Sequence, residues 1–285
     1  MTGPVVVGLD GSPASVTAAW WAAREAAGRH LPVVLLHSWT TQPLDAPVAQ
    51  EALGKQRYGG RVLHQMEAEL THRYKDLTLI TELVSGTAAQ SLVDASDGAS
   101  LLVLGSRGHG SVAGFLLGSV SLHVLGLTRC PTVAVRADGP AAEAGRPEIV
   151  VGVREAGPST DPLLELAFTS AELHGARVRA VRALPLSSLV THPHIGGDDD
   201  GYESDERGRL GAALAPWREK FPDIDVVNHV ARGVAAQVLL SASAHGMLTV
   251  LGRRRHPAPL TWRLGPVTHA ALHHTPCPVA VVPHD

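Results

Sequence analysis

The segment with the clearest chemical signature is a glycine-rich loop between a predicted strand and a predicted helix. It reads Gly105-Ser-Arg-Gly-His-Gly-Ser-Val-Ala-Gly-Phe-Leu-Leu-Gly-Ser119. Gly105 and Gly108 let the backbone approach an anion closely and adopt a positive φ. A helix that begins at Gly118-Ser119 would direct unpaired N–H groups and the positive end of its dipole to the same place. Together these features predict a phosphate-binding loop.

Side chains in this loop add hydrogen-bond donors and charge. Ser119 supplies a hydroxyl, and Arg107 and His109 can supply positive charge. The loop contains no lysine and matches neither the Walker nor the dinucleotide-binding glycine pattern. No pair of carboxylates with a catalytic spacing surrounds it, so we expect no catalytic residues. On these residues alone, a glycine-rich connector whose Ser119 caps a helix remains the alternative.

The chain consists of two copies of one unit. Between the copies, residues 139–147 are rich in Gly, Pro and Ala, which predicts a linker between domains at 1–138 and 148–285. Segments of the first half recur in the same order in the second, which indicates a duplication. The matching pairs are Val5–Asp10 with Ile149–Arg154, Leu101–Gly105 with Leu248–Gly252, and Cys130–Val135 with Cys277–Val282.

Short apolar runs alternate with segments of helical period in each copy. Several runs are apolar at every position, which is typical of strands buried on both faces of a parallel sheet. We therefore predict two tandem α/β domains, each an open, doubly wound, mostly parallel five-stranded sheet with helices on both faces. Such sheets bind ligands at the carboxyl ends of their strands. Strands are expected at 5–7, 32–36, 77–84, 101–104 and 132–135, and helices at 13–28, 51–75, 88–96 and 119–127.

The first of these helices has the clearest boundaries. Ser12 is a good N-cap and Pro13 suits the first helical position. Gly28 is expected to end the helix. Its apolar face is predicted to be Val16, Trp20, Ala23 and Ala27. In the second copy, Asp161-Pro162 predicts the start of the matching helix.

The spacing Gly-x2-Gly-x9-Gly-Ser, met at Gly105, Gly108, Gly118 and Ser119, resembles the ATP-binding signature of the universal stress protein family. The segments Val6–Ser12, Leu35–Ser38 and Cys130–Val135 are similar to strands of that family, and the resemblance covers essentially the whole chain as a tandem two-domain member. It implies ATP, with Mg²⁺ bridging its phosphates, held by the loop from Gly105 to Val120. It also implies that Asp10 and the region of Ser38 face the adenosine, that the protein serves stress adaptation or dormancy, and that it forms homodimers through sheet edges.

The second copy departs from this pattern. Arg154 stands at the position of Asp10, Arg255 at Gly108, Pro257 at Gly110 and Pro266 at Ser119, whereas Gly252 and Gly265 remain. A proline removes both the N–H and the hydroxyl that Ser119 offers. We predict that the second domain binds ATP far more weakly or not at all. Binding of an anion by the charges of residues 253–255 remains the alternative.

Composition narrows the function further. A net charge of −3, from 24 basic and 27 acidic residues, argues against a nucleic-acid partner. No apolar stretch is long enough for a membrane span, and two cysteines offer no disulfide framework, so we expect a reducing cytoplasm. Cys130 and Cys277 are expected to be buried thiols. The pair His269 and His273 lacks a third ligand and Asp198–Asp200, predicted to lie in an exposed loop, lacks the calcium-binding order, so no metal site is expected.

These features predict an ATP-binding, non-enzymatic sensor or interaction module with an unidentified protein partner. Two alternatives stay open at this point. One is a slow ATPase or phosphotransferase that uses the same loop, and the other is a structural scaffold that binds no nucleotide.

Overall fold

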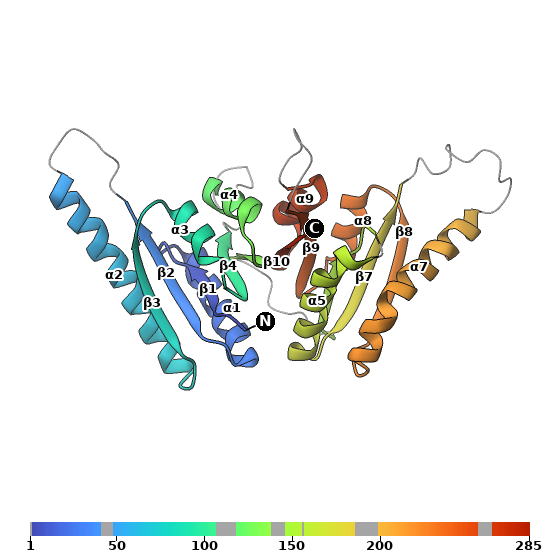
Figure 1. The fold of residues 1–285 in the computed structure, drawn as a ribbon, viewed down its shortest axis with the longest axis horizontal. Coiled ribbons are helices and arrows are strands. Elements are labelled where there is room, and N and C mark those ends of the chain that lie inside the picture. Colours follow the sequence, from blue (N-terminus) through green and yellow to red (C-terminus); the bar gives the residue numbers. More distant parts are fainter. Residues whose placement is uncertain are drawn as a thin grey trace. The chain divides into compact units, whose positions relative to one another are not determined.

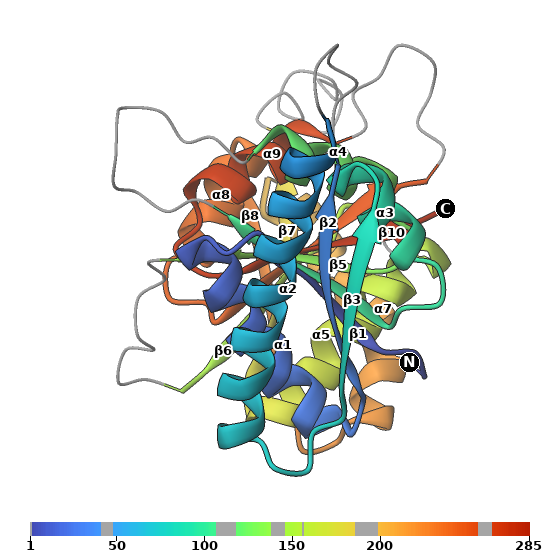
Figure 2. The same ribbon diagram turned by 90° about the vertical axis from the view of Figure 1, so that its left-hand side faces the viewer.

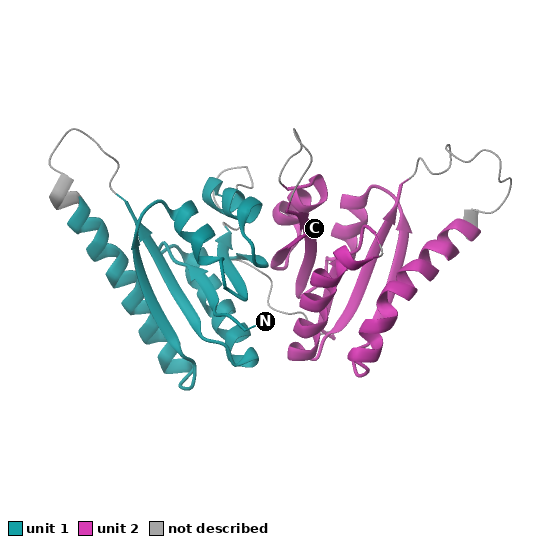
Figure 3. Ribbon diagram, in the orientation of Figure 1, with its two compact units in different colours: residues 1–139 teal, residues 140–285 magenta. Residues whose placement is uncertain are grey.

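The computed structural model describes residues 2–40, 48–106, 118–137, 146–155, 157–185, 199–255 and 264–285. The chain divides into unit 1, Met1–Gly139, and unit 2, Pro140–Asp285 (Figure 3). Strands and helices alternate along each unit (Figure 1). Within the described ranges, no helix combines the length and the apolar character that a membrane span needs.

Unit 1 is an open parallel sheet with helices on both faces. Its strand order is β3-β2-β1-β4-β5, and neighbouring strands pair in parallel. Helices α1 and α2 cover one face, where α2 packs along β2 and β3 (Figure 2), and α3 and α4 cover the other. The elements are β1 (Val5–Gly8), α1 (Pro13–Arg29), β2 (Val33–Trp39), α2 (Val48–Arg73), β3 (Leu79–Ser85), α3 (Ala88–Ala95), β4 (Leu101–Ser106), α4 (Ser119–Leu127) and β5 (Thr132–Arg136).

Unit 2 repeats this arrangement. Its strand order is β8-β7-β6-β9-β10, with parallel pairing throughout. Two doubly wound parallel sheets in tandem confirm the predicted fold class. The elements are β6 (Glu148–Gly152), the 3₁₀ turn η1 (Pro158–Thr160), α5 (Asp161–His174), β7 (Arg177–Leu184), α7 (Asp199–Lys220), β8 (Val226–Arg232), α8 (Ala235–Ala242), β9 (Leu248–Arg254), α9 (Pro266–His274) and β10 (Val279–His284).

The two central strands of unit 1 are buried on both faces, as their continuous apolar runs predict. Residues 5–7 of β1 and 101–104 of β4 are all buried. On the α3 and α4 side, the buried core combines strand residues with side chains from both helices. This core contains Val6, Val34, Leu36, Leu92, Leu102, Leu104, Val124 and Cys130.

Helix α1 differs from its prediction at its end. Gly28 does not stop the helix, which continues to Arg29. His30 forms the cap instead, in a left-handed conformation with φ of 54°, and its N–H bonds to the carbonyls of Ala26 and Ala27. The glycine stays inside the helix because these hydrogen bonds are satisfied two residues later.

The buried face of α1 also differs from its prediction. Of the predicted residues, Ala23 is buried, but Val16, Trp20 and Ala27 are only partly buried. The face against the sheet consists mainly of small residues, because α1 lies very close to β4. Its fully or almost fully buried alanines are Ala14, Ala18, Ala19, Ala22, Ala23 and Ala26.

A third difference concerns the acidic triplet at 198–200. Asp199 and Asp200 begin α7 and do not belong to the loop that we predicted, whereas Asp198 lies outside the described residues.

Candidate functional site

The predicted site residues of unit 1 that the structure describes lie at or next to one edge of the sheet. Asp10 follows β1, Gly105 lies in the last two residues of β4, and Ser38 is the penultimate residue of β2. Because β1 lies between β2 and β4 in a parallel sheet, these carboxyl ends share one edge. This edge is where doubly wound sheets bind their ligands.

The amino end of α4 faces the same edge. The backbone N–H of Arg129, just after this helix, donates to the Ser96 hydroxyl at 3.2 Å, at the opposite edge where β5 begins. Helix α4 therefore begins at the carboxyl edge, with Gly118 as its N-cap and Ser119 and Val120 as its first residues. Both Ser119 and Val120 are exposed. The first turn thus offers N–H groups and a hydroxyl to an incoming anion.

The loop after β1 fixes the carboxylate of Asp10. The backbone N–H of Ser12 donates to Asp10 Oδ1 at 2.9 Å, and the N–H of Asp10 lies 3.4 Å from the Ser15 hydroxyl oxygen. Partial burial by itself raises the pKa of Asp10, but the hydrogen bonds from Ser12 and Ser15 outweigh it and hold the pKa below its ordinary value. Asp10 is therefore ionised at neutral pH.

The two described glycines of the motif have different surroundings. A Cβ on Gly105 would lie 2.5 Å from the carbonyl carbon of Ala14, so the contact between β4 and α1 requires glycine there. No heavy atom of the described residues lies within 4 Å of a Cβ built on Gly118, and its φ of −57° suits any residue. Within the part of the chain that the structure describes, neither packing nor backbone conformation accounts for a glycine at the start of α4.

The structure brings Asp10, Ser38 and Gly105 to one edge of the sheet, together with residues 118–120. Arg107, Gly108 and His109 lie outside the described residues. The side chain of Ser38 is half-buried, and its strand position pairs with Val84 of β3.

Two further residues contact the Asp10 loop, and the sequence analysis missed both. Buried His37 places Nδ1 2.7 Å from the carbonyl oxygen of Leu9, and the Tyr58 hydroxyl donates to the carbonyl of Asp10 at 3.2 Å. The two rings meet edge to face, with centroids 6.0 Å apart. A histidine within the apolar run of β2 could have indicated a functional or positioning role from the sequence. No local pattern could have indicated the contact of Tyr58, because 48 residues separate it from Asp10.

The matching edge of unit 2 carries charged side chains. Arg154, at the position of Asp10, lies 3.5 Å from the carboxylate of Glu155. Arg182 donates to the carbonyl of Arg154 and to the buried carboxylate of Glu206. Pro266 is the first residue of α9 and offers neither an N–H nor a hydroxyl. The carboxyl edge of unit 2 thus differs from that of unit 1 in charge and in its hydrogen-bond donors.

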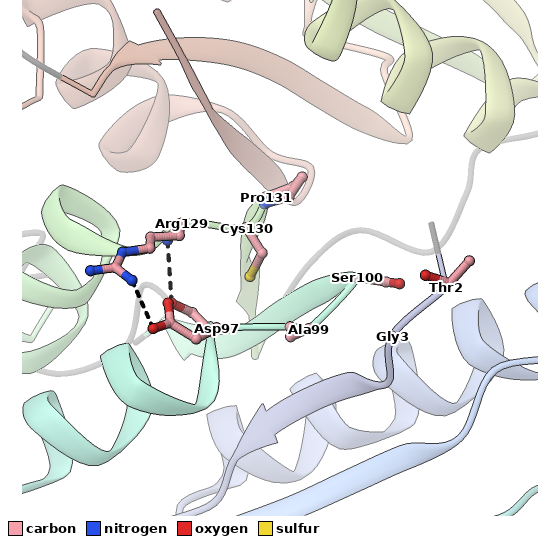
Figure 4. Close-up of a pocket in the computed structure, with 10 residues that line it drawn as sticks. Thr2, Gly3, Asp97, Ala99, Ser100, Arg129, Cys130 and Pro131 are labelled. Carbon is pink, nitrogen blue, oxygen red and sulfur yellow. Dashed lines mark hydrogen bonds and ion pairs between the residues drawn. The ribbon is translucent and has the colours of Figure 1, made fainter.

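A separate pocket of about 560 Å³ lies at the opposite edge of unit 1 and contains none of the predicted site residues (Figure 4). Arg129 forms an ion pair with Asp97 across it, with 2.8 Å between the guanidinium nitrogen and the carboxylate oxygen. Burial raises the pKa of the Cys130 thiol, which also lines the pocket, to about 12. Cys130 therefore stays protonated at neutral pH and is a poor nucleophile. Cys277 is buried as well, as predicted.

The histidine pair of α9 is close but incomplete as a metal site. The rings of His269 and His273 stack with centroids 5.2 Å apart. Among the residues that the structure describes, no three His, Cys, Asp or Glu side chains are placed to hold a metal ion together.

Comparison with known proteins shows which family and which solved structures this chain resembles. The profile of the universal stress protein family matches residues 1–136 and 146–283. A universal stress protein of Mycolicibacterium smegmatis is 30% identical over 286 residues, covering 98% of this chain and 96% of the relative. One from Mycobacterium tuberculosis is 31% identical over 287 residues, covering 97% and 96%. The crystal structure of a universal stress protein from Archaeoglobus fulgidus superposes with a TM-score of 0.68 at 17% identity, covering 99% of this chain and 98% of that one.

Proposed function

The chain belongs to the universal stress protein family, and we propose that its unit 1 binds ATP at the carboxyl edge of the sheet. The observation that carries this proposal is the open, glycine-bordered start of α4. No described residue packs against a Cβ built on Gly118, and the first turn presents exposed Ser119 and Val120. A phosphate group is the kind of ligand that needs close backbone approach, free N–H groups and the positive end of a helix dipole together.

Each site residue has a distinct role in this proposal. The backbone at Gly105, Gly108 and residues 118–120, with the Ser119 hydroxyl, binds the phosphates. Arg107 and His109 add positive charge. Ser38 and the ionised carboxylate of Asp10 face the adenosine, where a carboxylate can accept hydrogen bonds from hydroxyl or amino groups. Mg²⁺, when bound together with the nucleotide, would supply positive charge that partly neutralises the phosphates.

The same geometry favours a binding function over catalysis. The low pKa of Asp10 makes its carboxylate a weak base, and its Oδ1 already accepts a hydrogen bond from the Ser12 N–H. A general base for hydrolysis needs a pKa nearer to the working pH. We therefore propose a nucleotide-dependent sensor or interaction module for stress adaptation or dormancy. We propose that it acts in the cytoplasm as a homodimer with a protein partner.

Unit 2 is proposed to bind ATP far more weakly or not at all. At its edge the arginine side chains have nearby carboxylates, since Arg254 lies 3.8 Å from Glu155 and Arg255 lies 3.8 Å from Asp285. These pairings reduce the charge available to an anion, which weakens the alternative of an arginine-based anion site.

Isothermal titration calorimetry with ATP in magnesium-containing buffer tests the proposal. Binding to the wild type that Ser119→Ala weakens would support it, and absence of heat with any adenine nucleotide would contradict it. Mass spectrometry of the denatured, desalted protein tests the alternative of a structural scaffold. That alternative predicts that no nucleotide co-purifies, whereas the proposal is supported by co-purifying ATP. Steady release of ADP that Asp10→Asn abolishes would instead favour the ATPase alternative.

A further inference from the structure

One side chain from β2 and one from α2 hold the loop that carries Asp10. His37 Nδ1 carries a proton in this contact, because the carbonyl of Leu9 at 2.7 Å can only accept. The Tyr58 hydroxyl donates to the next carbonyl, that of Asp10, at 3.2 Å. Two consecutive carbonyls of one loop are thus bound by two side chains that also contact each other.

Two glycines make room for these side chains. A Cβ on Gly59 of α2 would lie 2.4 Å from Cδ2 of His37. A Cβ on Gly11 would lie 2.3 Å from the Tyr58 hydroxyl oxygen, and Gly11 also has a φ of +81°, which favours glycine. Because both of these positions are glycine, the two rings can approach the backbone of α2 and of the Asp10 loop closely.

The carbonyl of Asp10 and its counterpart in unit 2 each accept a hydrogen bond from a side chain, but the two side chains differ in type. The N–H of Leu9 bonds to the carbonyl of Leu36, and the N–H of Val153 makes the equivalent bond to the carbonyl of Val181. The residues that follow these two acceptors, His37 and Arg182, are therefore counterparts. Arg182 donates to the carbonyl of Arg154, which matches that of Asp10. Unit 2 holds this loop with the guanidinium of Arg182, and unit 1 holds it with two aromatic rings.

We infer that His37 and Tyr58 are positioning residues that hold the Asp10 loop in its nucleotide-binding shape and couple it to α2. This inference rests on the function proposed above and deepens it. Tyr58 lies on α2, so nucleotide contacts that order the loop also order this part of the helix. By linkage, the factor by which bound nucleotide strengthens the helix contact equals the factor by which that contact strengthens nucleotide binding.

The variant Tyr58→Phe tests the inference, because it keeps the ring and removes only the donor hydroxyl. Without nucleotide, amide hydrogen exchange at residues 9–12 is expected to become about two- to tenfold faster, the scale of one neutral hydrogen bond. ATP affinity is expected to fall by about the same factor. In the wild type, ATP should slow exchange in the part of α2 around Tyr58, and this protection should be smaller in the variant.

Tyr74→Phe is the matched control. Tyr74 directly follows α2 and packs against Trp20, with ring centroids 6.3 Å apart, so its change should leave both the exchange and the affinity as in the wild type. His37→Asn offers a second variant whose side chain retains a donor, and it should lose less affinity than His37→Leu.

The outcomes separate this inference from the proposed function. Unchanged exchange at residues 9–12 together with unchanged ATP affinity in Tyr58→Phe would overturn the inference while ATP binding stands. A fall in melting temperature with uniform loss of protection across unit 1 would also overturn it, because that result indicates general destabilisation. A wild type that binds no ATP would overturn the proposed function, and the exchange comparison alone would then decide whether the two rings hold the loop.

Discussion

At the scale of single residues, Gly105 and Gly118 belong to one sequence motif but serve different purposes. Gly105 lets β4 touch the backbone of α1, since a Cβ there would lie 2.5 Å from Ala14. Gly118 has no heavy atom of a described residue within 4 Å of its built Cβ and has an ordinary backbone conformation. The first glycine is required by packing, whereas the second is one that we propose to contact the phosphates.

Alanine substitutions should separate these two purposes. Gly105→Ala is expected to lower the free energy of unfolding by about 1–3 kcal/mol, because the new methyl group overpacks a backbone contact. Gly118→Ala should leave that free energy within about 0.5 kcal/mol of the wild type. It should weaken ATP binding about tenfold or more, as hydrogen bonds to the charged phosphates lengthen.

Denaturant unfolding and calorimetric titration measure the two effects. Gly265→Ala is the matched control, because the N-cap glycine of α9 also has no heavy atom of a described residue within 4 Å of its built Cβ. It should change neither quantity. Loss of stability in Gly118→Ala would show that packing explains this glycine after all.

The depressed pKa of Asp10 predicts a pH dependence of stability. A carboxyl whose pKa is lower in the folded state stabilises that state above its unfolded pKa and loses this effect as the pH falls through the folded value. The stability difference between wild type and Asp10→Asn should therefore be constant near neutral pH and shrink below about pH 4. Urea unfolding at several pH values measures it. A difference that grows on acidification would contradict the hydrogen-bond pattern around Asp10.

At the scale of secondary structure, α4 and α9 are the same element with different first residues. Ser119 begins α4 and Pro266 begins α9, and each helix has nine residues with a glycine N-cap. Proline is tolerated at the first helical position, where the missing N–H would have no partner inside the helix. The duplication therefore shows that this helix forms without the hydroxyl and the N–H.

Ser119→Pro should consequently separate helix stability from binding. The melting temperature is expected to change little, because α9 carries the same residue at the same position. ATP affinity should fall at least about tenfold, because two donors to a charged group are lost together. Thermal unfolding and titration measure the two effects, and Pro266→Ser serves as the reverse substitution, which should not create a second site by itself. Full ATP affinity in Ser119→Pro would exclude the start of α4 from the site.

At the scale of the whole molecule, duplication supplied two similar units whose carboxyl edges carry different side chains. Both have the same strand order and helices on both faces. Asp10, with the rings of His37 and Tyr58 against its loop, lies at the edge of unit 1, whereas Arg154, Arg182 and Glu206 occupy the matching edge of unit 2.

This divergence predicts one ATP per chain. Titration should return a stoichiometry near one, and ATP at about 100 times its dissociation constant should stabilise unit 1 by about 2.7 kcal/mol. Protection from hydrogen exchange on adding ATP should appear in residues 1–139 and be absent from residues 140–285. Two equivalents of bound nucleotide, or protection in both units, would contradict the asymmetry.

The order of strands and helices followed from local sequence, because short apolar runs and helical periods are properties of neighbouring residues. The helices at 88–96 and 119–127 differ from their predicted bounds by at most one residue. Where prediction failed, a more distant or a competing contact decided the result. Gly28 did not end α1 because His30 capped it, and the alanine face of α1 was selected by close approach to β4.

The sequence by itself determined the duplication, the doubly wound fold, the glycine spacing and the substitutions that mark the second half, because each of these is a pattern of residue types along the chain. Only the tertiary structure decided which glycine packing requires, how Asp10 is held, and that Tyr58 contacts a loop 48 residues away. The physical reason is that hydrogen bonds and close contacts depend on distances in space, and the folding of α2 against the sheet creates distances that no local pattern encodes.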